Sequence, residues 1–335
     1  MPIQRGIQYD DRWSLRGIPA IVLANRWLRV VVLPQLGGKI WSIEYRPHSR
    51  EWLWHNPRID VGLAPFGAAF DDYWSGGADV AFPSCYESTW NGWKVPDLGE
   101  LWSIPWNVSH TFLPDSVTLT LTVGGRIWPV EVQRTITLNS HLPVVNMTFK
   151  ITNVGSQSFP FLLGFHPAIA AEPGYRLDLA PGNVKVDEGT QEMGDIGQEY
   201  SWPYLAKSES DRPRDMRIMP PYTEGSYGGH FFRPSTAALW WAITDPKEQS
   251  GIGLVASINE WQGLWIWQVF GGWRGYYHVA VEPWTGYPIT LHEAVKLNSA
   301  RWLAPHSNYQ ATLTTVCYEG IDHVTAIDID GTVFS

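Results

Sequence analysis

The sequence predicts an all-β protein made of antiparallel strands, with little helix. Short segments alternate apolar with polar residues and are rich in Val, Ile, Thr, Tyr and Trp, as strands with one buried face are. Turn-forming residues separate almost all of these segments, and the chain holds 31 Gly and 25 Pro. No stretch of about twelve residues repeats its apolar positions with the period of a helix.

The predicted strands, in chain order, are 20–33, 117–123, 126–138, 144–151, 253–258, 264–270, 278–281 and 310–318. Between them, residues 187–227 mix Gly, Pro and both charges, which predicts a long loop across one face of a sandwich. Near the C-terminus, the letters DIDG at 328–331 predict an Asp-Gly turn between two short strands. No segment has the composition of a linker, so residues 1–335 are interpreted as one domain.

Composition and charge exclude several classes of protein. Hydrophobic residues make up 44% of the chain, which is enough for a large core, and aromatic residues alone make up 14%. The apolar runs are shorter than the ~20 residues that a membrane-spanning helix needs. The net charge of -9 comes with scattered Lys and Arg, so a nucleic acid is not an expected partner.

The cysteines and the N-terminal residues point away from secretion and metal binding. Cys85 and Cys317 are far apart and have no His or Cys at metal-ligand spacing, so no disulfide framework and no metal site is predicted. The first residues show neither a basic and apolar signal sequence nor an Arg-rich amphipathic leader. We therefore expect a cytoplasmic location. The short apolar runs predict no membrane contact, and because the Gly-Gly pairs form no dinucleotide-binding fingerprint, no cofactor is expected.

One carboxylate is placed at the end of a predicted strand. The period of two puts His278, Ala280 and Glu282 on one face, directly before Pro283 ends the ladder. A lone carboxylate beside so much apolar surface is costly unless it has a partner or a function. Glu282 is therefore a candidate catalytic residue.

Tryptophans gather in the sequence around this carboxylate. Trp265 and Trp267 share one face of the preceding strand, while Trp273 and Trp284 flank the neighbouring loops. Such rings offer flat apolar faces that match the C-H faces of a sugar ring. The alternative, that each ring simply fills a large core, stays open at this point.

One histidine follows an apolar strand in the same way. Residues 161–165 are apolar and lead directly to His166 and Pro167. The histidine is either a core residue bonded to the backbone or a group that gives and takes a proton near neutral pH. Together with Glu282 it supplies the minimal pair for moving a proton across a small substrate.

Three stretches of the sequence resemble proteins of the galactose mutarotase-like, or aldose 1-epimerase, family. They are LPQLGGKIWSIE at 33–44, LGFHP at 163–167 and VEPWTG at 281–286. The first is similar to an early strand pair of the family, and the other two to the strands that present the catalytic histidine and glutamate. The regions 76–83 (GGADVAFP) and 96–102 (PDLGELW) also resemble the family.

The resemblance implies a β-supersandwich of large antiparallel sheets with an open cleft for carbohydrate. It implies Glu282 as a base that removes the O1 proton of a sugar and His166 as an acid that protonates the ring oxygen. The ring then opens, rotates about C1-C2 and closes as the other anomer. Lys39 and Asp79, which lie in the similar regions, are assigned to sugar binding together with Trp267 and Trp284.

The sequence departs from the family pattern at one turn. Leu98 stands where the family has a histidine, and the motifs do not locate the arginine with which mutarotases hold sugar hydroxyls. Two alternatives therefore stay open beside mutarotation. One is a carbohydrate-binding protein without catalysis, and the other is a lyase or hydrolase acting on glycosidic bonds with further carboxylates such as Asp79, Glu87 and Glu100.

Overall fold

The computed structural model describes residues 3–4, 6–206 and 212–335. Strands hold about 53% of the residues and helices 6%, and the ladders between the strands are antiparallel, so the predicted fold class is confirmed. The chain divides into two compact units, unit 1 (Met1–Pro167 with Trp284–Leu313) and unit 2 (Ala168–Pro283 with Thr314–Ser335). The interpretation as one domain stays a prediction.

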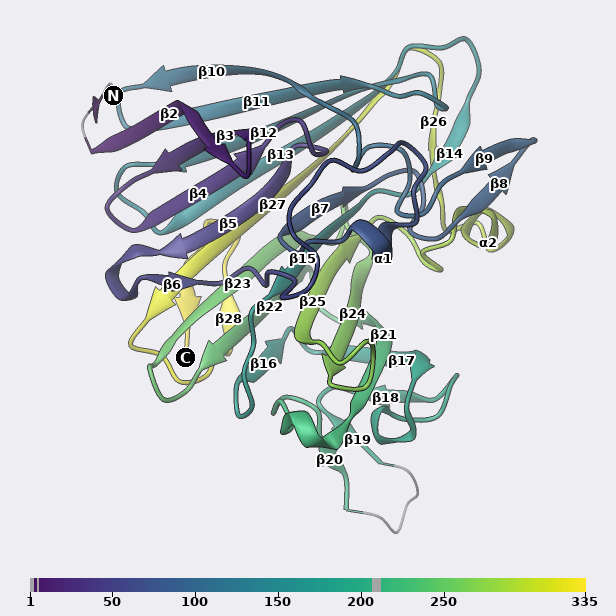
Figure 1. Cartoon of the computed structure of the whole chain (residues 1–335). Coiled ribbons are helices and arrows are strands. Elements are labelled where there is room, and N and C mark those ends of the chain that lie inside the picture. The colour runs from purple at the N-terminus through teal and green to yellow at the C-terminus, as the bar shows by residue number, and fades with distance from the viewer. Residues whose placement is uncertain (1–2, 5, 207–211) are drawn as a thin grey trace. The chain divides into compact units, whose positions relative to one another are not determined.

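Unit 1 contains a sheet that carries most of the candidate site. Its strands follow the order β1-β2-β3-β4-β5-β7-β15, with β6 on β5, and Figure 1 shows β2 to β5 side by side. Their bounds are β1 Ile3–Gln4, β2 Ile7–Leu15, β3 Ile18–Ala24, β4 Leu28–Leu33, β5 Lys39–Tyr45, β6 Arg50–Glu51, β7 Ala78–Ala81 and β15 Gly164–Ile169. A 3-10 helix, η1, covers Arg46–His48.

A second ladder of unit 1 joins four long strands in chain order. They are β10 Asn107–Leu113, β11 Ser116–Gly124, β12 Val130–Asn139 and β13 Val144–Asn153. In β11 the Val and Leu residues are buried and the Ser and Thr residues between them are partly exposed, because successive side chains of a strand point to opposite faces. Phe149 of β13 meets Phe165 of β15 with ring centroids 6.2 Å apart, so the two sheets share a core.

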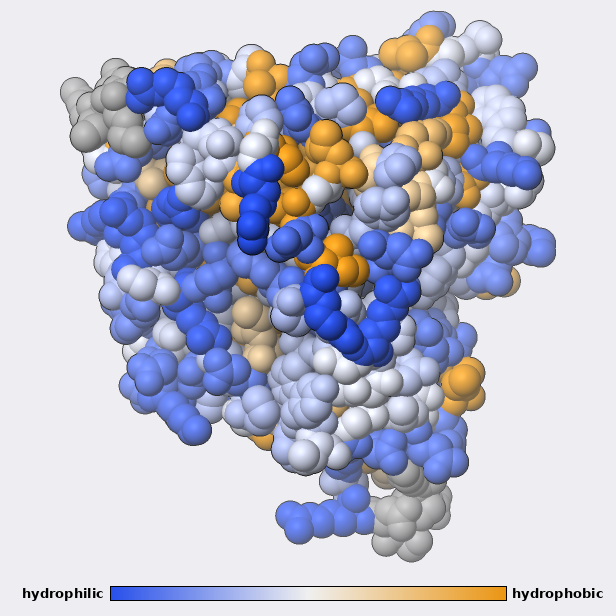
Figure 2. Space-filling view, in the orientation of Figure 1, coloured by the Kyte–Doolittle hydropathy of each residue, from blue (hydrophilic) through white to orange (hydrophobic). Residues whose placement is uncertain are grey.

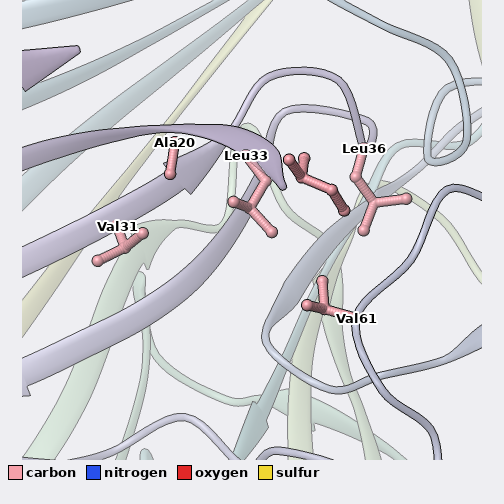
Figure 3. Close-up of a cluster of buried hydrophobic side chains, with 6 residues drawn as sticks. Ala20, Val31, Leu33, Leu36 and Val61 are labelled. Atoms are coloured by element: carbon pink, nitrogen blue, oxygen red, sulfur yellow. The ribbon is translucent and has the colours of Figure 1, made fainter. Parts of the chain in front are cut away.

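One face of the first sheet is covered by chain from outside it (Figure 3). Ala20, Val31 and Leu33 of β3 and β4 form a buried cluster with Leu36 and with Val61, which comes from the segment between β6 and β7. The covering segment includes α1 (Phe70–Tyr73), a single helical turn. This placement brings aromatic residues of a loop onto the face that carries the candidate site.

The rest of unit 1 consists of short elements. These are the hairpin β8 Ser88–Trp90 and β9 Trp93–Val95, the pair β14 Phe159–Phe161 and β26 Arg301–Leu303, and the helix α2 Leu291–Lys296. Two serines hold the start of α2, since Ser84 Oγ accepts from the Leu291 N-H at 3.0 Å and Ser88 Oγ from the His292 N-H at 3.1 Å. They satisfy donors that a helix N-terminus otherwise leaves open.

Unit 2 also has two sheets, with the strand orders β25-β24-β21-β17-β18 and β27-β23-β22-β16. Trp284 at the end of β25 and the part of β27 up to Leu313 belong to unit 1. Their bounds are β16 Arg176–Leu179, β17 Gly182–Gly189, β18 Glu199–Ser201, β21 Ser226–Pro234, β22 Ala238–Asp245, β23 Ser250–Ser257, β24 Gly263–Phe270, β25 Tyr277–Trp284 and β27 Asn308–Glu319. Smaller elements are η2 Gln191–Met193, β19 Tyr204–Leu205, β20 Arg214–Asp215, η3 Tyr222–Glu224, β28 Ala326–Ile327 and β29 Val333–Phe334.

Three sequence expectations can be compared with these elements. The predicted strand 20–33 is wrong as one strand, because a turn at Asn25 divides it into β3 and β4. The segment 187–227 is largely irregular but contains the short strands β18, β19 and β20, and residues 207–211 lie outside the described part. The predicted Asp-Gly turn is confirmed, since the Gly331 N-H donates to the Asp328 carbonyl at 2.8 Å between β28 and β29.

The surface seen in Figure 2 is mostly hydrophilic, with hydrophobic residues in separate patches. No helix among the described residues is long and apolar enough to cross a membrane.

Candidate active site

Three neighbouring strands of unit 1 place Lys39, Asp79 and His166 on one face of the first sheet. Ile40 of β5 is opposite Ala78 of β7, and Asp79 of β7 is opposite His166 of β15. The three side chains are 2%, 1% and 7% exposed. The pairing of the three strands thus brings together three of the predicted site residues, although Lys39 and Asp79 are 40 positions apart in the chain (79 − 39) and Asp79 and His166 are 87 apart (166 − 79).

Lys39 and Asp79 form a buried ion pair. The Lys39 Nζ donates to Asp79 Oδ2 at 2.6 Å and to the Gly76 carbonyl at 2.7 Å. Burial raises the pKa of the Asp79 carboxyl, and the charges of Lys39 and Arg134 oppose that rise. A buried charge of this kind is tolerated only with a close and well-oriented partner.

The Gly76-Gly77 pair allows the backbone to pass closely enough for these contacts. Both glycines have positive φ, +97° and +83°. A Cβ at Gly76 would lie 2.1 Å from the Trp54 carbonyl oxygen, and one at Gly77 would lie 2.7 Å from the Ile40 carbonyl oxygen. Only glycine fits both demands, which explains why the Gly-Gly element precedes Asp79.

His166 lies among aromatic rings from the covering segment. Its ring makes edge contacts with Phe70 at 5.6 Å and Trp74 at 5.2 Å between centroids. Burial lowers the pKa of His166 to about 4, and the charge of Lys39 adds to the effect. The imidazole is therefore neutral at pH 7, which matters for the acid role that the sequence predicts.

Arg134 is a charged residue of this region that the motifs did not locate. It lies on β12, is fully buried, and donates from Nη2 to the Gly38 carbonyl in the turn before Lys39. Burial lowers the pKa of Arg134 to about 10, while Asp79 raises it. Within the described residues, its Nε and Nη1 have no hydrogen-bond partner.

A sequence signal for Arg134 does exist. Val132 and Ile136 on the same strand are fully buried, so Arg134 occupies the inward phase of an alternating strand. An arginine at an inward position is rare without a partner. It supplies a second cation to the surroundings of Asp79.

Unit 2 contains Glu282, the predicted catalytic carboxylate, and Trp267, one of the tryptophans predicted to stack on a sugar. Glu282 is 1% exposed on β25, and His278 on the same strand is fully buried. Trp267 of β24 is half-buried and makes edge contacts with Tyr227 at 5.5 Å and Trp273 at 5.8 Å. The three rings form a partly exposed aromatic group that is held in place by its own contacts.

A glycine beside this aromatic group allows close packing of its neighbours. Gly229 of β21 is paired with Trp267 in the ladder, and a Cβ there would lie 2.4 Å from the Trp265 ring and 2.7 Å from Glu188 Cγ. A side chain at Gly229 would collide with both groups, so glycine is required at this position of β21.

The structure places Trp284 in the interior. Its side chain has no exposed surface, and its ring lies against Gly164, where a Cβ would be only 2.5 Å away. This burial favours the core-packing interpretation over sugar stacking for Trp284.

The other carboxylates considered from the sequence have structural contacts or lie elsewhere. Glu100 is fully buried and accepts the N-H groups of Arg126, Ile127 and Trp128 at 2.6, 2.6 and 3.1 Å. Burial raises the pKa of Glu100 against these bonds. Glu100 therefore stabilises the turn formed by these three residues. Glu87, in contrast, is exposed beside the β8-β9 hairpin.

Leu98 occupies the turn where the resemblance expects a histidine. Its φ is +54°, it is 2% exposed, and its N-H donates to the Cys85 carbonyl at 2.6 Å. A bulky residue rarely adopts this left-handed conformation. The side chain provides neither a proton nor a hydrogen bond at this place.

No group of three or more His, Cys, Asp or Glu side chains in the described ranges could hold a metal ion.

Comparisons with known proteins concern the fold. No protein-family model and no curated protein matches the chain. Among solved structures, a candidate aldose 1-epimerase from Klebsiella pneumoniae matches with a TM-score of 0.70 and 13% identity over 93% of this chain and 83% of its own. A galactose mutarotase-like protein from Clostridium acetobutylicum matches with a TM-score of 0.65 and 13% identity over 94% and 99%.

A third match carries a specific name. A galactose 1-epimerase from Lactobacillus acidophilus is similar with a TM-score of 0.55 and 10% identity over 94% of this chain and 99% of its own. At these identities the likeness concerns the fold. The chain has the galactose mutarotase-like fold that the resemblance of its motifs implies.

Proposed function

We propose that the chain is an aldose 1-epimerase that interconverts the α and β anomers of a sugar. The observation that carries the proposal is the placement of His166, Asp79 and Lys39 on neighbouring strands of a galactose mutarotase-like fold. The fold neighbours that carry epimerase names support the substrate class. Location in the cytoplasm and a sugar as the small-molecule partner belong to the same proposal.

In this proposal Glu282 acts as the base that removes the O1 proton. His166 supplies a proton to the ring oxygen, the C1-O5 bond breaks, and rotation about C1-C2 precedes closure on the other face. The proton that leaves O1 and the proton that reaches O5 are returned in the reverse order on closure, so no cofactor takes part. The Lys39-Asp79 pair holds β5 and β7 in the register that positions His166.

The test is anomer exchange measured by NMR. Saturation transfer between the α and β signals of galactose, glucose, mannose and xylose is expected to increase when the protein is added. If sugar signals broaden without transfer, the chain is a binding protein. If oligosaccharides yield new reducing ends or unsaturated products, it acts on glycosidic bonds.

The pH profile of kcat/KM is expected to differ from that of an enzyme whose acid is a histidine with an ordinary pKa. An unperturbed imidazole would place the alkaline limb of a bell-shaped profile near neutral pH. Because burial lowers the pKa of His166 to about 4, the protonated acid becomes scarcer above that pH and the rate should decline from about pH 4 upward. An alkaline limb at pH 7 or above would contradict the role of His166 as an acid with this pKa.

Trp267 is expected to contribute to sugar binding through its half-exposed ring. Trp267→Ala should weaken binding about three- to tenfold, the worth of one aromatic contact, with a raised KM and a nearly unchanged kcat. Trp273→Ala removes the neighbouring ring, which supports Trp267 from its edge, and should have a smaller effect. Equal KM values for the Trp267 variant and the parent would assign this ring to packing.

A further inference from the structure

Four tryptophans meet at the β8-β9 hairpin of unit 1, apart from the residues assigned to catalysis. Trp90 and Trp93 belong to the hairpin, Trp128 precedes β12, and Trp302 belongs to β26. Trp90 meets Trp93 at 5.8 Å, Trp128 at 6.3 Å and Trp302 at 6.1 Å between ring centroids. Trp93 also meets Trp128 at 5.3 Å, edge to face. We call these four residues the tryptophan platform.

Two rings of the platform are left open to solvent. Trp93 is 38% and Trp302 55% exposed, whereas Trp128, which contacts Trp90 and Trp93, is 1% exposed. Large aromatic surface in contact with water is unfavourable, and its concentration at one place marks an interaction site. The platform therefore offers two partly exposed rings, Trp93 supported by the buried Trp128 and Trp302 supported by Trp90.

Contacts within the protein hold two rings of the platform, Trp128 and Trp302, in place without a ligand. The Trp128 Nε1-H donates to the Pro160 carbonyl at 3.1 Å, and Trp302 is paired with Pro160 in the β14-β26 ladder. One residue of β14 thus positions both the base of the platform and one of its exposed rings. Such preorganisation lowers the entropic cost of binding.

An open groove of about 900 Å³ is lined by Thr89, Lys94 and Ile127, which directly neighbour Trp90, Trp93 and Trp128 in the chain. Its walls also include His292 and Lys296 of α2, and Glu87. The hairpin, α2 and the β14-β26 pair lie together at one end of unit 1 (Figure 1). Trp93 is two residues from Val95, which lines the groove, so platform and groove are about 7 Å apart along the strand.

The chemistry of the groove separates a sugar from a protein partner. The polar lining carries both signs of charge and hydroxyl groups. Trp93, whose ring is partly exposed, belongs to the same short strand as the lining residues Lys94 and Val95. The core of a protein interface is depleted in charged residues. Ring faces next to mixed hydrogen-bonding groups instead suit pyranose units, which present C-H faces and many hydroxyls.

We infer that the groove and the tryptophan platform bind a linear chain of neutral pyranose units, with sugar rings stacked on Trp93 and Trp302. This inference stands independently of the proposed mutarotation, because it concerns saccharide binding and none of its residues belongs to the assigned catalytic group.

The test is binding of hexasaccharides of the cello, malto and xylo series. Binding is measured by isothermal titration calorimetry and by 19F NMR of protein labelled with 5-fluorotryptophan. At least one series should bind and shift the resonances of Trp93 and Trp302, identified from Trp93→Phe and Trp302→Phe. Trp93→Ala and Trp302→Ala should each weaken that binding about three- to tenfold. Trp13→Ala, which removes a ring that is 40% exposed on β2, should leave it unchanged.

Binding of none of the three series, or equal affinity in both platform variants and the parent, would overturn the inference. So would a dimer in analytical ultracentrifugation that Trp302→Ala dissociates, because the platform would then be an interface between copies of the chain. Anomer exchange of free sugars, measured on the same variants, should keep the parent rate. Loss of exchange in Glu282→Gln without loss of hexasaccharide binding would separate this inference from the proposed catalysis.

Discussion

Glu282→Gln and His166→Asn are each expected to lower the rate of anomer interconversion by about 10²- to 10⁴-fold, the usual effect of removing a positioned base or acid. Glu282→Gln keeps the shape of the side chain, whereas His166→Asn replaces the imidazole by a smaller polar amide; both sites are at least nine-tenths buried. The measurement is saturation transfer between anomer signals at saturating sugar. Sugar affinity should change much less than the rate, because the lost groups act on protons in transit.

The double variant should be about as slow as either single variant. Ring opening needs both proton transfers, so one deletion already stalls it, and residues that act as a unit show strongly non-additive effects. Additive losses would instead indicate two independent contributions.

Matched controls come from each unit. His55→Asn changes a partly buried histidine of unit 1 that is stacked on Trp41, and Glu260→Gln changes a partly buried glutamate of unit 2. Both should keep the parent rate. Circular dichroism and the thermal midpoint must show that the slow variants are folded. A parent-like rate in a folded Glu282 or His166 variant would remove that residue from the mechanism.

The strands were predictable where one face is buried and the other meets water. In β11 the alternation of Val and Leu with Thr appears directly in the sequence, because the burial of only one face imposes a period of two. The division of 20–33 was not predictable in this way. The turn contains neither Gly nor Pro and depends on the Asn25 side chain, whose Oδ1 accepts the N-H groups of Trp27 and Leu28.

The candidate site was predictable in its residues more than in its contacts. His166 and Asp79 stand in stretches with a recognisable pattern, but their pairing depends on the register of β7 and β15, which local sequence does not specify. The low pKa of His166 follows from burial, to which Phe70 and Trp74 contribute from the segment around α1, more than ninety residues earlier in the chain. Arg134 was detectable by its inward phase on β12.

The roles of the tryptophans show what strand periodicity does not predict. Periodicity gives the face of the sheet on which Trp267 or Trp284 lies, but not what covers that face. In the structure Trp267 is half-buried in an aromatic group while Trp284 packs against Gly164. The close approach of a ring to a glycine is a tertiary contact, so the sequence alone left both interpretations open.

Lys39→Met is expected to destabilise the fold by about 3–5 kcal/mol, the usual cost of leaving one member of a buried ion pair without its partner. The Lys39 Nζ is 2.6 Å from Asp79 Oδ2, and the two side chains are 2% and 1% exposed. The measurement is equilibrium unfolding in urea, with the slope of the transition checked for constancy. Asp79→Asn should also be costly, because it leaves Lys39 and Arg134 as buried cations without an anion.

The double variant Lys39→Met, Asp79→Asn distinguishes an ion pair from two separate packing sites. Its loss of stability should be smaller than the sum of the losses in the single variants, because neither remaining group of the pair carries a charge. Part of the loss should remain, because Arg134 keeps its bond to the Gly38 carbonyl but no longer has the Asp79 anion near it. Asp60→Asn, which breaks the exposed Arg16-Asp60 pair at 3.5 Å, should change stability little. Strict additivity of the two buried replacements would show that Lys39 and Asp79 do not stabilise one another, and the pair could then not be what holds β5 and β7 in register beside His166.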